Sequence, residues 1–362
     1  MIALLIFTGT DCKKDGDIII PPDTTKPPVV DTTSHNFTWT QFTFGGDAGS
    51  SVLYDVAIVN DSLIYAVGEI IVRDSAGNVK NPPYNIARWD GKQWILETLN
   101  FEFENGTLYA TAHAIIAFAA DDIFISSGSS IMHWDGNSWK NVGILYSNGI
   151  SIGNVLRFWG TSSNNLYGVG RSGSIVHYNG SPNGAGTWSK LESGTTLDVQ
   201  DIWGAKNETT GEYEVLAVAS QRFQNVGKKI LQINGTIVTS LPDSGLSWSL
   251  SSVWFVAGKK YYVVGGGIYE KNILDNSVWV DKASEITTYY PFSIRGNAPN
   301  DIVTAGGGGE ILHYNGKSWQ SYYSQTKVAS GNYYSVAIKN NIVVAVGQDN
   351  PKAMITVGIK IK

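Results

Sequence analysis

Five histidines are the side chains of this 362-residue chain best suited to bind a metal ion or to move a proton. Three of them, His133, His177 and His313, stand at one point of a recurring phrase, directly before an aromatic residue, Asp or Asn, and Gly. Arg88 and Gln232 take that point in two further copies. Equivalent residues of separate repeats lie in separate structural units, so they cannot share one metal ion. We therefore expect a structural role for these histidines, pairing with a neighbouring strand, and we expect no metal site and no cofactor.

A pair of carboxylates about 5–9.5 Å apart would be needed to hydrolyse a glycosidic bond. Asp55 and Asp201 are the one pair that the repeats described below place at comparable positions. They belong to the first and fourth repeats, an arrangement that sets them nearly opposite each other and disfavours them as catalytic partners. We assign no catalytic residue on this basis.

The elements that must position these side chains are indicated by the recurring phrase itself. The segments Trp89–Trp94, Trp134–Trp139 and Tyr314–Trp319 read aromatic, Asp or Asn, Gly, two variable residues and Trp, and a looser copy runs from Tyr178 to Trp188. Asp-Gly or Asn-Gly between apolar runs is typical of a β-hairpin with a type I′ turn, in which both central residues have φ > 0.

Each hairpin belongs to a longer repeat of three or four short apolar runs. A glycine of the second run recurs as Gly68, Gly128, Gly170, Gly265, Gly306 and Gly347, and Ala219-Ser220 replaces it in one repeat, so that the seven positions have a mean spacing of about 46 residues. Four strands per period of this length predict an all-β fold, a seven-bladed β-propeller with four-stranded antiparallel blades.

The two ends of the chain indicate how such a ring would close. The last repeat, from Tyr334 to Ile359, contains three strands and no tryptophan strand after them. An orphan strand, Phe37–Phe42, precedes the first repeat and resembles the fourth-strand phrase Ser318–Tyr322. We predict that residues 36–44 complete the last blade, because an open ring would leave an unpaired sheet edge.

The same geometry predicts where a ligand would bind. Loops that join the second strand to the third, and the fourth strand to the next blade, fall on one face around the mouth of the central channel. Aligning the first strands of the seven repeats places a polar set at this mouth: Tyr54, Asp55, His113, Arg157, Gln200, Asp201 and Tyr334. We predict that this set binds a ligand. The alternative is a hydrated channel in which the same side chains only link neighbouring blades.

The N-terminal segment is similar to that of a bacterial lipoprotein. An apolar start, Met1–Phe7, precedes Cys12, the single cysteine of the chain, and a Pro/Thr/Asp-rich stretch follows. The resemblance implies a leader of residues 1–12 that ends at an acylated Cys12, a flexible tether of residues 13–33 and one propeller domain of residues 34–362. It also implies a place in the bacterial cell envelope, periplasmic or at the surface, with membrane contact only through the lipid.

Composition narrows the classes of partner. Charged residues make up 16% of the chain, against about 25% in soluble domains, and the net charge is −5. No basic stripe with interleaved aromatic residues is present, which excludes nucleic acid as an expected partner. We expect a monomer.

The full repeat reads aromatic-Gly, then Asn/Asp-apolar-aromatic-x-x-Gly, then Gly-x-Ile-x-His-Tyr-Asn-Gly-x-x-Trp. It resembles the repeats of bacterial seven-bladed propellers, loosely grouped with kelch-like, Asp-box and photosystem II assembly-factor-like proteins. The likeness covers residues 36–362 and implies the fold, whereas function varies widely among propellers.

Residues 181–188 also resemble the Asp-box of sialidases, with Asn183 and Ala185 in place of its Asp and Gly. In those enzymes the Asp-box is structural, and catalysis uses three arginines that clamp the substrate carboxylate, a tyrosine nucleophile with a glutamate, and an acidic proton donor. The six arginines of this chain show no such triad in the sequence: Arg73, Arg88, Arg157, Arg171, Arg222 and Arg295.

We therefore expect a non-enzymatic, envelope-anchored propeller that acts as a binding or scaffolding module for a protein or a glycan. The alternative is a glycoside hydrolase or sialidase-like enzyme with its site at the channel mouth.

Overall fold

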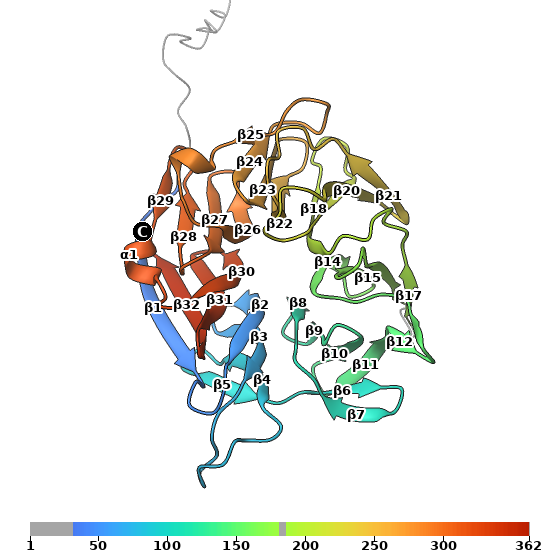
Figure 1. Cartoon of the computed structure of the whole chain (residues 1–362), viewed down its shortest axis with the longest axis vertical. Coiled ribbons are helices and arrows are strands. Elements are labelled where there is room, and N and C mark those ends of the chain that lie inside the picture. Colours follow the sequence, from blue (N-terminus) through green and yellow to red (C-terminus); the bar gives the residue numbers. More distant parts are fainter. Residues whose placement is uncertain (1–31, 181–185, 362) are drawn as a thin grey trace, which may run out of the picture. The chain divides into compact units, whose positions relative to one another are not determined.

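The computed structural model describes residues 32–180 and 186–361, and their strands form seven four-stranded antiparallel sheets arranged in a ring (Figure 1). Blade 1 contains β2 (Val52–Asn60), β3 (Leu63–Ile70), β4 (Tyr84–Trp89) and β5 (Trp94–Glu97). Blade 2 contains β8 (Ala114–Ala119), β9 (Asp122–Ser126), β10 (Ser130–Trp134) and β11 (Trp139–Ile144). Blade 3 contains β14 (Arg157–Ser162), β15 (Asn165–Val169), β16 (Ile175–Asn179) and β17 (Thr187–Lys190).

Blade 4 contains β18 (Val199–Lys206), β19 (Tyr213–Ser220), β20 (Lys228–Asn234) and β21 (Ile237–Leu241). Blade 5 contains β22 (Leu250–Val256), β23 (Lys260–Gly265), β24 (Ile268–Lys271) and β25 (Val280–Asp281). Blade 6 contains β26 (Pro291–Ala298), β27 (Asp301–Gly306), β28 (Ile311–Tyr314) and β29 (Trp319–Ser321). The predicted seven-bladed propeller is confirmed.

The remaining elements are short and lie between blades. Two hairpins, β6 (Asn100–Phe103) with β7 (Gly106–Tyr109) and β12 (Tyr146–Ser147) with β13 (Ile150–Ser151), flank blade 2 in the sequence. A 3-10 turn, η1 (Ala283–Glu285), and one helical turn, α1 (Tyr323–Thr326), follow blades 5 and 6. Within the described ranges, no helix has both the length and the apolar character that a membrane crossing requires.

Blade 7 joins the two ends of the described chain. It contains β30 (Gly331–Lys339), β31 (Ile342–Asp349) and β32 (Lys352–Lys360), and its fourth strand is β1 (Phe37–Phe44). Strand β1 runs antiparallel to β32 along its whole length, from Phe37 opposite Lys360 to Phe44 opposite Ala353. The predicted closure of the ring by residues 36–44 is thus confirmed.

Contacts just before β1 also fasten this strand to blade 6. The Thr33 hydroxyl donates to the carbonyl of Asn300 at 2.6 Å, and the Nδ1 atoms of His35 and His313 lie 2.9 Å apart. Thr33 is therefore bonded to the propeller, although the sequence assigned it to the tether. The predicted leader, Cys12 and tether residues 13–31 lie outside the described residues, as do residues 181–185 of the Asp-box-like segment.

The recurring hairpin turn differs from the one expected. Only its glycines have positive φ, for example 91° at Gly91, whereas a type I′ turn would also require it at Asp90. The Asp90 carboxylate instead accepts hydrogen bonds from the backbone N–H groups of Lys92 and Gln93, at 2.9 and 2.8 Å. Asp135 and Asn315 do the same in blades 2 and 6. A short polar side chain that satisfies the turn backbone explains why Asp or Asn recurs there.

The repeated histidines have the structural role that we expected. Each donates or accepts one hydrogen bond with the first residue of the adjacent second strand of its blade: His133 with Asp122, His177 with Asn165 and His313 with Asp301, at 2.7–2.8 Å. Among the described residues no three His, Cys, Asp or Glu side chains gather as a possible metal site.

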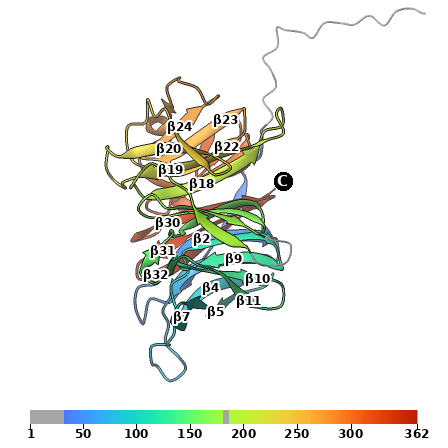
Figure 2. The same ribbon diagram turned by 90° about the vertical axis from the view of Figure 1, so that its right-hand side faces the viewer.

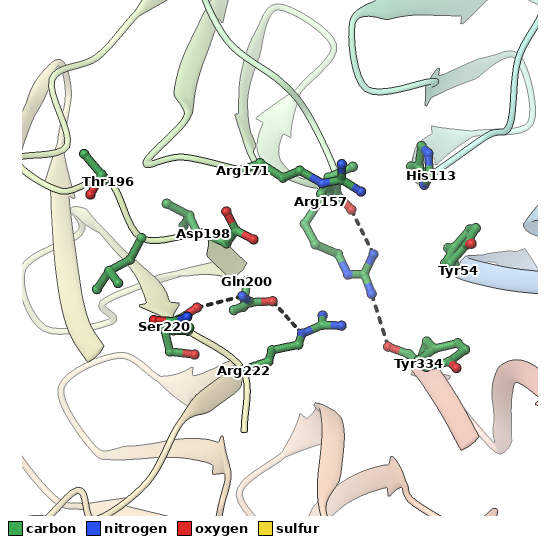
Figure 3. Close-up of a pocket in the computed structure, with 14 residues that line it drawn as sticks. Tyr54, His113, Arg157, Arg171, Thr196, Asp198, Gln200, Ser220, Arg222 and Tyr334 are labelled. Carbon is green, nitrogen blue, oxygen red and sulfur yellow. Dashed lines mark hydrogen bonds between the residues drawn. The ribbon is translucent and has the colours of Figure 1, made fainter. Parts of the chain in front are cut away.

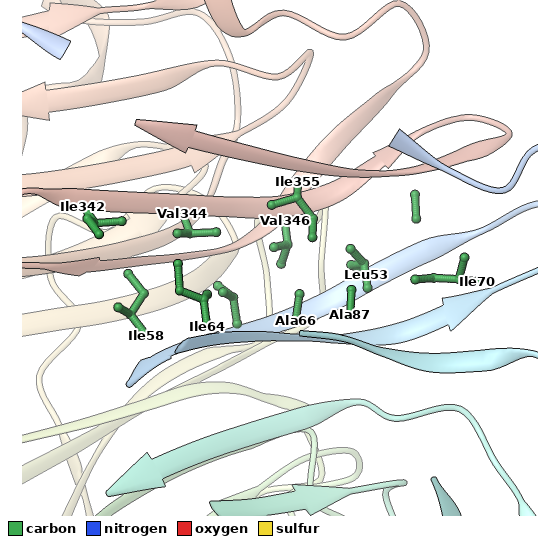
Figure 4. Packing of buried hydrophobic residues seen from close by; sticks show 12 residues of the cluster. Leu53, Ile58, Ile64, Ala66, Ile70, Ala87, Ile342, Val344, Val346 and Ile355 are labelled. Atoms are coloured by element: carbon green, nitrogen blue, oxygen red, sulfur yellow. The ribbon is translucent and has the colours of Figure 1, made fainter. Parts of the chain in front are cut away.

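Packing between neighbouring blades forms the core. Because side chains alternate across each strand, a blade directs one apolar row at each neighbour. At the junction of blades 1 and 7, Leu53, Ile64 and Ala66 pack against Val344, Val346 and Ile355, and all six are at most 2% exposed (Figure 4). Figure 2 shows the blades from the side. The strands labelled there run across the picture, which is the viewing direction of Figure 1. This stacking holds the inner strands, and the loops at their ends, in fixed positions.

Candidate functional site

One residue position on the inner strands links neighbouring blades around the channel. The Asp55 carboxylate accepts a hydrogen bond from the backbone N–H of Ile115 in blade 2, at 3.1 Å. Equivalent bonds run from Val253 to Asp201, from Ile294 to Ser252 and from Val336 to Ser293, at 3.1–3.2 Å. Ser335 of blade 7 donates to Asp55 at 2.8 Å. The links are continuous from blade 4 through blades 5, 6, 7 and 1 to blade 2.

Asp55 and Asp201, two of the predicted ligand-binding residues, belong to these links. Asp201 is buried and receives two bonds from the Arg295 guanidinium, at 2.8 and 2.9 Å, and one from the Ser252 hydroxyl. Burial alone would raise the pKa of Asp201, but the charge of Arg295 and the hydrogen bonds hold it below its ordinary value. Both carboxylates are thus engaged with protein groups, and neither lines the mouth cavity described next. These are blade-linking contacts of the kind that we named as the alternative, and the predicted ligand binding of Asp55 and Asp201 stays a prediction.

The ring of links is interrupted at blades 2 and 3, where Ala114 and Arg157 take this position. Alanine has no polar side-chain atom and arginine no acceptor, so neither can bind the next blade's N–H. A cavity of about 720 Å³ opens there, on the face of the second-to-third-strand loops (Figure 3). Its lining residues are Tyr54, His113, Leu156, Arg157, Arg171, Thr196, Leu197, Asp198, Val199, Gln200, Ser220, Gln221, Arg222 and Tyr334. We call this space the mouth cavity.

β-Bulges on the inner strands aim several side chains into the mouth cavity. The register of β2 against β3 shifts between Leu53 and Asp55, which leaves Tyr54 as the extra residue. Gln200 of β18 and Tyr334 of β30 are extra residues at equivalent shifts. A bulge bends the strand and re-aims a side chain, which explains why the residue before the linking position turns towards the mouth.

Three arginine side chains extend into the mouth cavity from different elements (Figure 3). Arg157 begins β14, Arg171 lies in the loop between β15 and β16, and Arg222 follows β19. Arg157 donates to the backbone carbonyls of Leu156 at 2.8 Å and of Tyr334 at 3.1 Å, and so reaches across to blade 7. Arg222 donates to the Gln200 side chain at 2.8 Å. No carboxylate in the described part of the chain forms a salt bridge with any of the three.

The electrostatics of the mouth cavity favour an anion. Asp198 is the one carboxylate among the lining residues, and it accepts the backbone N–H of Ser172 at 2.8 Å. Burial, together with the charges of Arg171 and Arg157, lowers the pKa of His113 to about 4, so its ring is neutral near pH 7. Partial desolvation by the surrounding cavity and the charge of Arg157 lower the pKa of Arg222, although an arginine stays protonated at neutral pH. The cavity therefore carries a net positive charge.

The structure brings together five of the seven residues that the sequence suggested: Tyr54, His113, Arg157, Gln200 and Tyr334. Their predicted ligand binding stays a prediction. The sequence analysis missed Arg171, Asp198 and Arg222. Arg171 directly follows Gly170, the repeated second-strand glycine, and that offset places it in a loop on the mouth face. This position was a signal from which the sequence could have identified Arg171.

Comparison with known proteins finds solved structures of similar fold but identifies no family for this chain. No family model matches the chain, and no curated protein matches it. Among solved structures, the one named YCF48 bound to D1 peptide is similar, with a TM-score of 0.64 and 15% identity over 93% of this chain and 100% of that chain. The WD40 propeller domain of Doa1 has a TM-score of 0.61 and 13% identity, over 91% and 99% of the two chains.

A third similar structure is that of a catalytically inactive virginiamycin B lyase from Staphylococcus aureus with quinupristin. Its TM-score is 0.58 at 10% identity, and the match covers 90% of this chain and 100% of the lyase. Identities this low establish a shared propeller fold alone, and the three proteins show that this fold accommodates different functions.

Proposed function

We propose that this chain is a non-enzymatic binding module, anchored in the cell envelope, whose mouth cavity binds an acidic segment of a partner protein. The observation that carries the proposal is the convergence of Arg157, Arg171 and Arg222 on one cavity with a single carboxylate in its lining. Arg171 and Arg222 are exposed and Arg157 is partly buried, so a ligand can reach all three, and none of them is paired with a carboxylate among the described residues. An anionic ligand would provide the missing charge through bidentate, charge-assisted hydrogen bonds.

Aromatic side chains beside the arginines favour a peptide over a small inorganic anion. Phe223 follows Arg222, is 57% exposed and has a φ of 59°, a conformation that is rare for a bulky residue and that concentrates at functional sites. Its ring lies 5.1 Å from that of Tyr290, and the ring of Phe292 lies 5.6 Å from that of Tyr334 at the mouth. Apolar residues of an acidic peptide could pack on this surface while its carboxylates contact the arginines.

Two further observations support binding of a peptide without catalysis. Asp55 and Asp201, the pair considered for glycosidic hydrolysis, are both engaged in linking blades. A propeller similar in fold, YCF48, has been solved with a peptide bound. That likeness supports the view that a propeller of this fold can bind a peptide. It says nothing of the partner of this chain.

The envelope anchor rests on the sequence, since Cys12 lies outside the described residues. Acylation there would hold the propeller near the membrane at the end of the stretch that precedes Thr32. We expect the protein to fractionate with membranes in a bacterial host and the Cys12→Ser variant to be released. A wild-type protein that is found free of membranes would contradict the anchor and leave the mouth proposal intact.

Peptide binding tests the mouth proposal. The probe is a short fluorescein-labelled peptide in which Glu and Asp alternate with Leu and Phe, compared with the same peptide carrying Gln and Asn. We expect wild-type protein to raise the anisotropy of the acidic peptide only, and added salt to weaken this binding. The variant R157Q/R171Q/R222Q should bind at least about 30-fold more weakly, because several charge-assisted hydrogen bonds are lost.

Thermal melting provides the control, because Arg157 also bonds to Tyr334 across the mouth. The affinities of the wild type and of R157Q/R171Q/R222Q can be compared if the variant melts close to the wild-type temperature. Equal affinity of wild type and triple variant, or equal binding of the uncharged peptide, would contradict the proposal.

A further inference from the structure

A second cavity, of about 690 Å³, lies between blades 1 and 2. Its lining includes Asp121, in the turn from the first to the second strand of blade 2, and Gly136, in the turn from the third to the fourth. In an antiparallel blade these turns lie at the opposite end from the loops that form the mouth. We call this cavity the interblade groove, and it faces away from the mouth cavity.

Two tryptophans form an aromatic wall of the interblade groove. The ring centroids of Trp134 and Trp139 are 5.6 Å apart, and both side chains pack against the apolar cluster between blades 1 and 2. Both are only partly buried, so ring surface remains available to a ligand. Their indole N–H groups are bonded to no protein acceptor in the described ranges, and neither is among the indole nitrogens shut off from solvent.

Polar side chains of blade 1 form the other wall. The Arg88 guanidinium and the Glu97 carboxylate make an ion pair at 2.7 Å, with 27% and 36% of their side chains exposed. Tyr65, whose ring lies in the same apolar cluster, lines the groove beside them. Together with Asp121 of blade 2, these groups add hydrogen-bond donors and acceptors to the lining of the cavity that the two indole rings also line. The two acids against one arginine give the groove no excess of positive charge.

The corresponding groups at the junction of blades 2 and 3 are already engaged. His133 takes the position of Arg88 there, bonds to Asp122 and stacks on Phe124 at 4.1 Å. Trp188, which corresponds to Trp139, donates its indole N–H to the backbone carbonyl of Val142 at 3.0 Å. At the junction of blades 1 and 2, by contrast, the indole N–H of Trp139 has no protein acceptor in the described ranges, and the side chains of Arg88 and Glu97 bond only to each other there.

We propose that the interblade groove binds the pyranose ring of a carbohydrate. A sugar ring has an apolar C–H face that packs on an indole, and its hydroxyls both donate and accept hydrogen bonds. The Arg88–Glu97 pair offers a donor and an acceptor side by side for two neighbouring hydroxyls, and the indole N–H groups offer further donors. An acidic peptide fits poorly, because Glu97 and Asp121 would repel it. This inference is independent of the proposed function of the mouth.

A glycan array followed by calorimetric titration of the best neutral oligosaccharide tests the proposal. We expect saturable binding of one oligosaccharide. Its affinity should fall at least about tenfold in Glu97→Gln, because the charged acceptor is lost. It should also fall in Trp139→Phe, because the N–H is lost while the aromatic packing remains. Trp319→Phe, at the matching position of blade 6, should bind as the wild type does.

The mouth variant R157Q/R171Q/R222Q should also retain the sugar, so failure of one proposal is distinguishable from failure of the other. An array with no bound carbohydrate would overturn the groove proposal. So would binding that survives both Glu97→Gln and Trp139→Phe, or binding that Trp319→Phe abolishes equally.

Discussion

Removal of residues 34–44 is expected to lower the free energy of unfolding by more than about 4 kcal/mol, the scale of deleting large core side chains. The deletion strips β32 of its partner along the whole of β1 and exposes a sheet edge. It also removes Trp39 and Phe37, whose rings lie 5.0 and 5.6 Å from that of Tyr322. Urea unfolding of the truncated and full-length proteins would measure the difference.

Point variants separate strand pairing from side-chain packing. The exposed Thr40→Ala change on β1 should have little effect, whereas Trp39→Ala should destabilise strongly. Gly358→Ala is a matched test from the partner strand, because a Cβ there would lie 2.3 Å from the Trp39 ring. A truncated protein that melts at the full-length temperature would refute closure of the ring by β1.

Replacement of Asp201 by Ala is expected to cost about 3–5 kcal/mol, because it leaves the mostly buried Arg295 guanidinium without its carboxylate. Asp201→Leu combined with Arg295→Met should be less harmful than Asp201→Ala, since it removes both charges. Asp243→Ala, in an exposed loop, is the control. Chemical unfolding at pH 7 measures the free energy of unfolding of each variant. An Asp201→Ala variant as stable as the wild type would contradict the linking role.

The pH dependence of stability follows from the same pair. The folded-state pKa of Asp201 lies below its ordinary value of 3.8, so the unfolded state takes up the proton first as pH falls. The stabilisation is therefore fully present well above pH 3.8 and is lost as pH falls below that value, through the folded-state pKa. Wild-type protein should lose its advantage over Asp201→Ala in this acidic range.

The sequence was sufficient to predict the fold because its evidence is local and repeated. Gly347 marks a second strand just as Gly68 does, and the missing fourth strand of the last repeat could be matched to residues 36–44. The turn type was wrong, since Asp90 acts through its side chain and needs no positive φ. That distinction depends on loop geometry, which a dipeptide does not specify.

The mouth could be predicted only in part, for two physical reasons. Tyr54 and Asp55 are adjacent, and a bulge that the sequence does not reveal decides which of them reaches the cavity and which links blades. Arg222 lies in a loop whose length differs from those of the other repeats, so alignment could not place it beside Arg157. The apolar rows of the strands specify the ring of blades. The mouth cavity depends instead on where the hydrogen bonds between neighbouring blades are interrupted.

The central claim, that the mouth arginines bind an acidic partner segment, is tested most directly by a comparison at constant net charge. The acidic peptide is titrated into R157Q/R171Q/R222Q and into K92Q/K206Q/K317Q, which removes three exposed lysines elsewhere on the propeller. We predict that the lysine variant binds nearly as the wild type does and that the arginine variant loses at least about 30-fold in affinity. Equal losses in the two variants would show attraction to overall charge and contradict a site at the mouth.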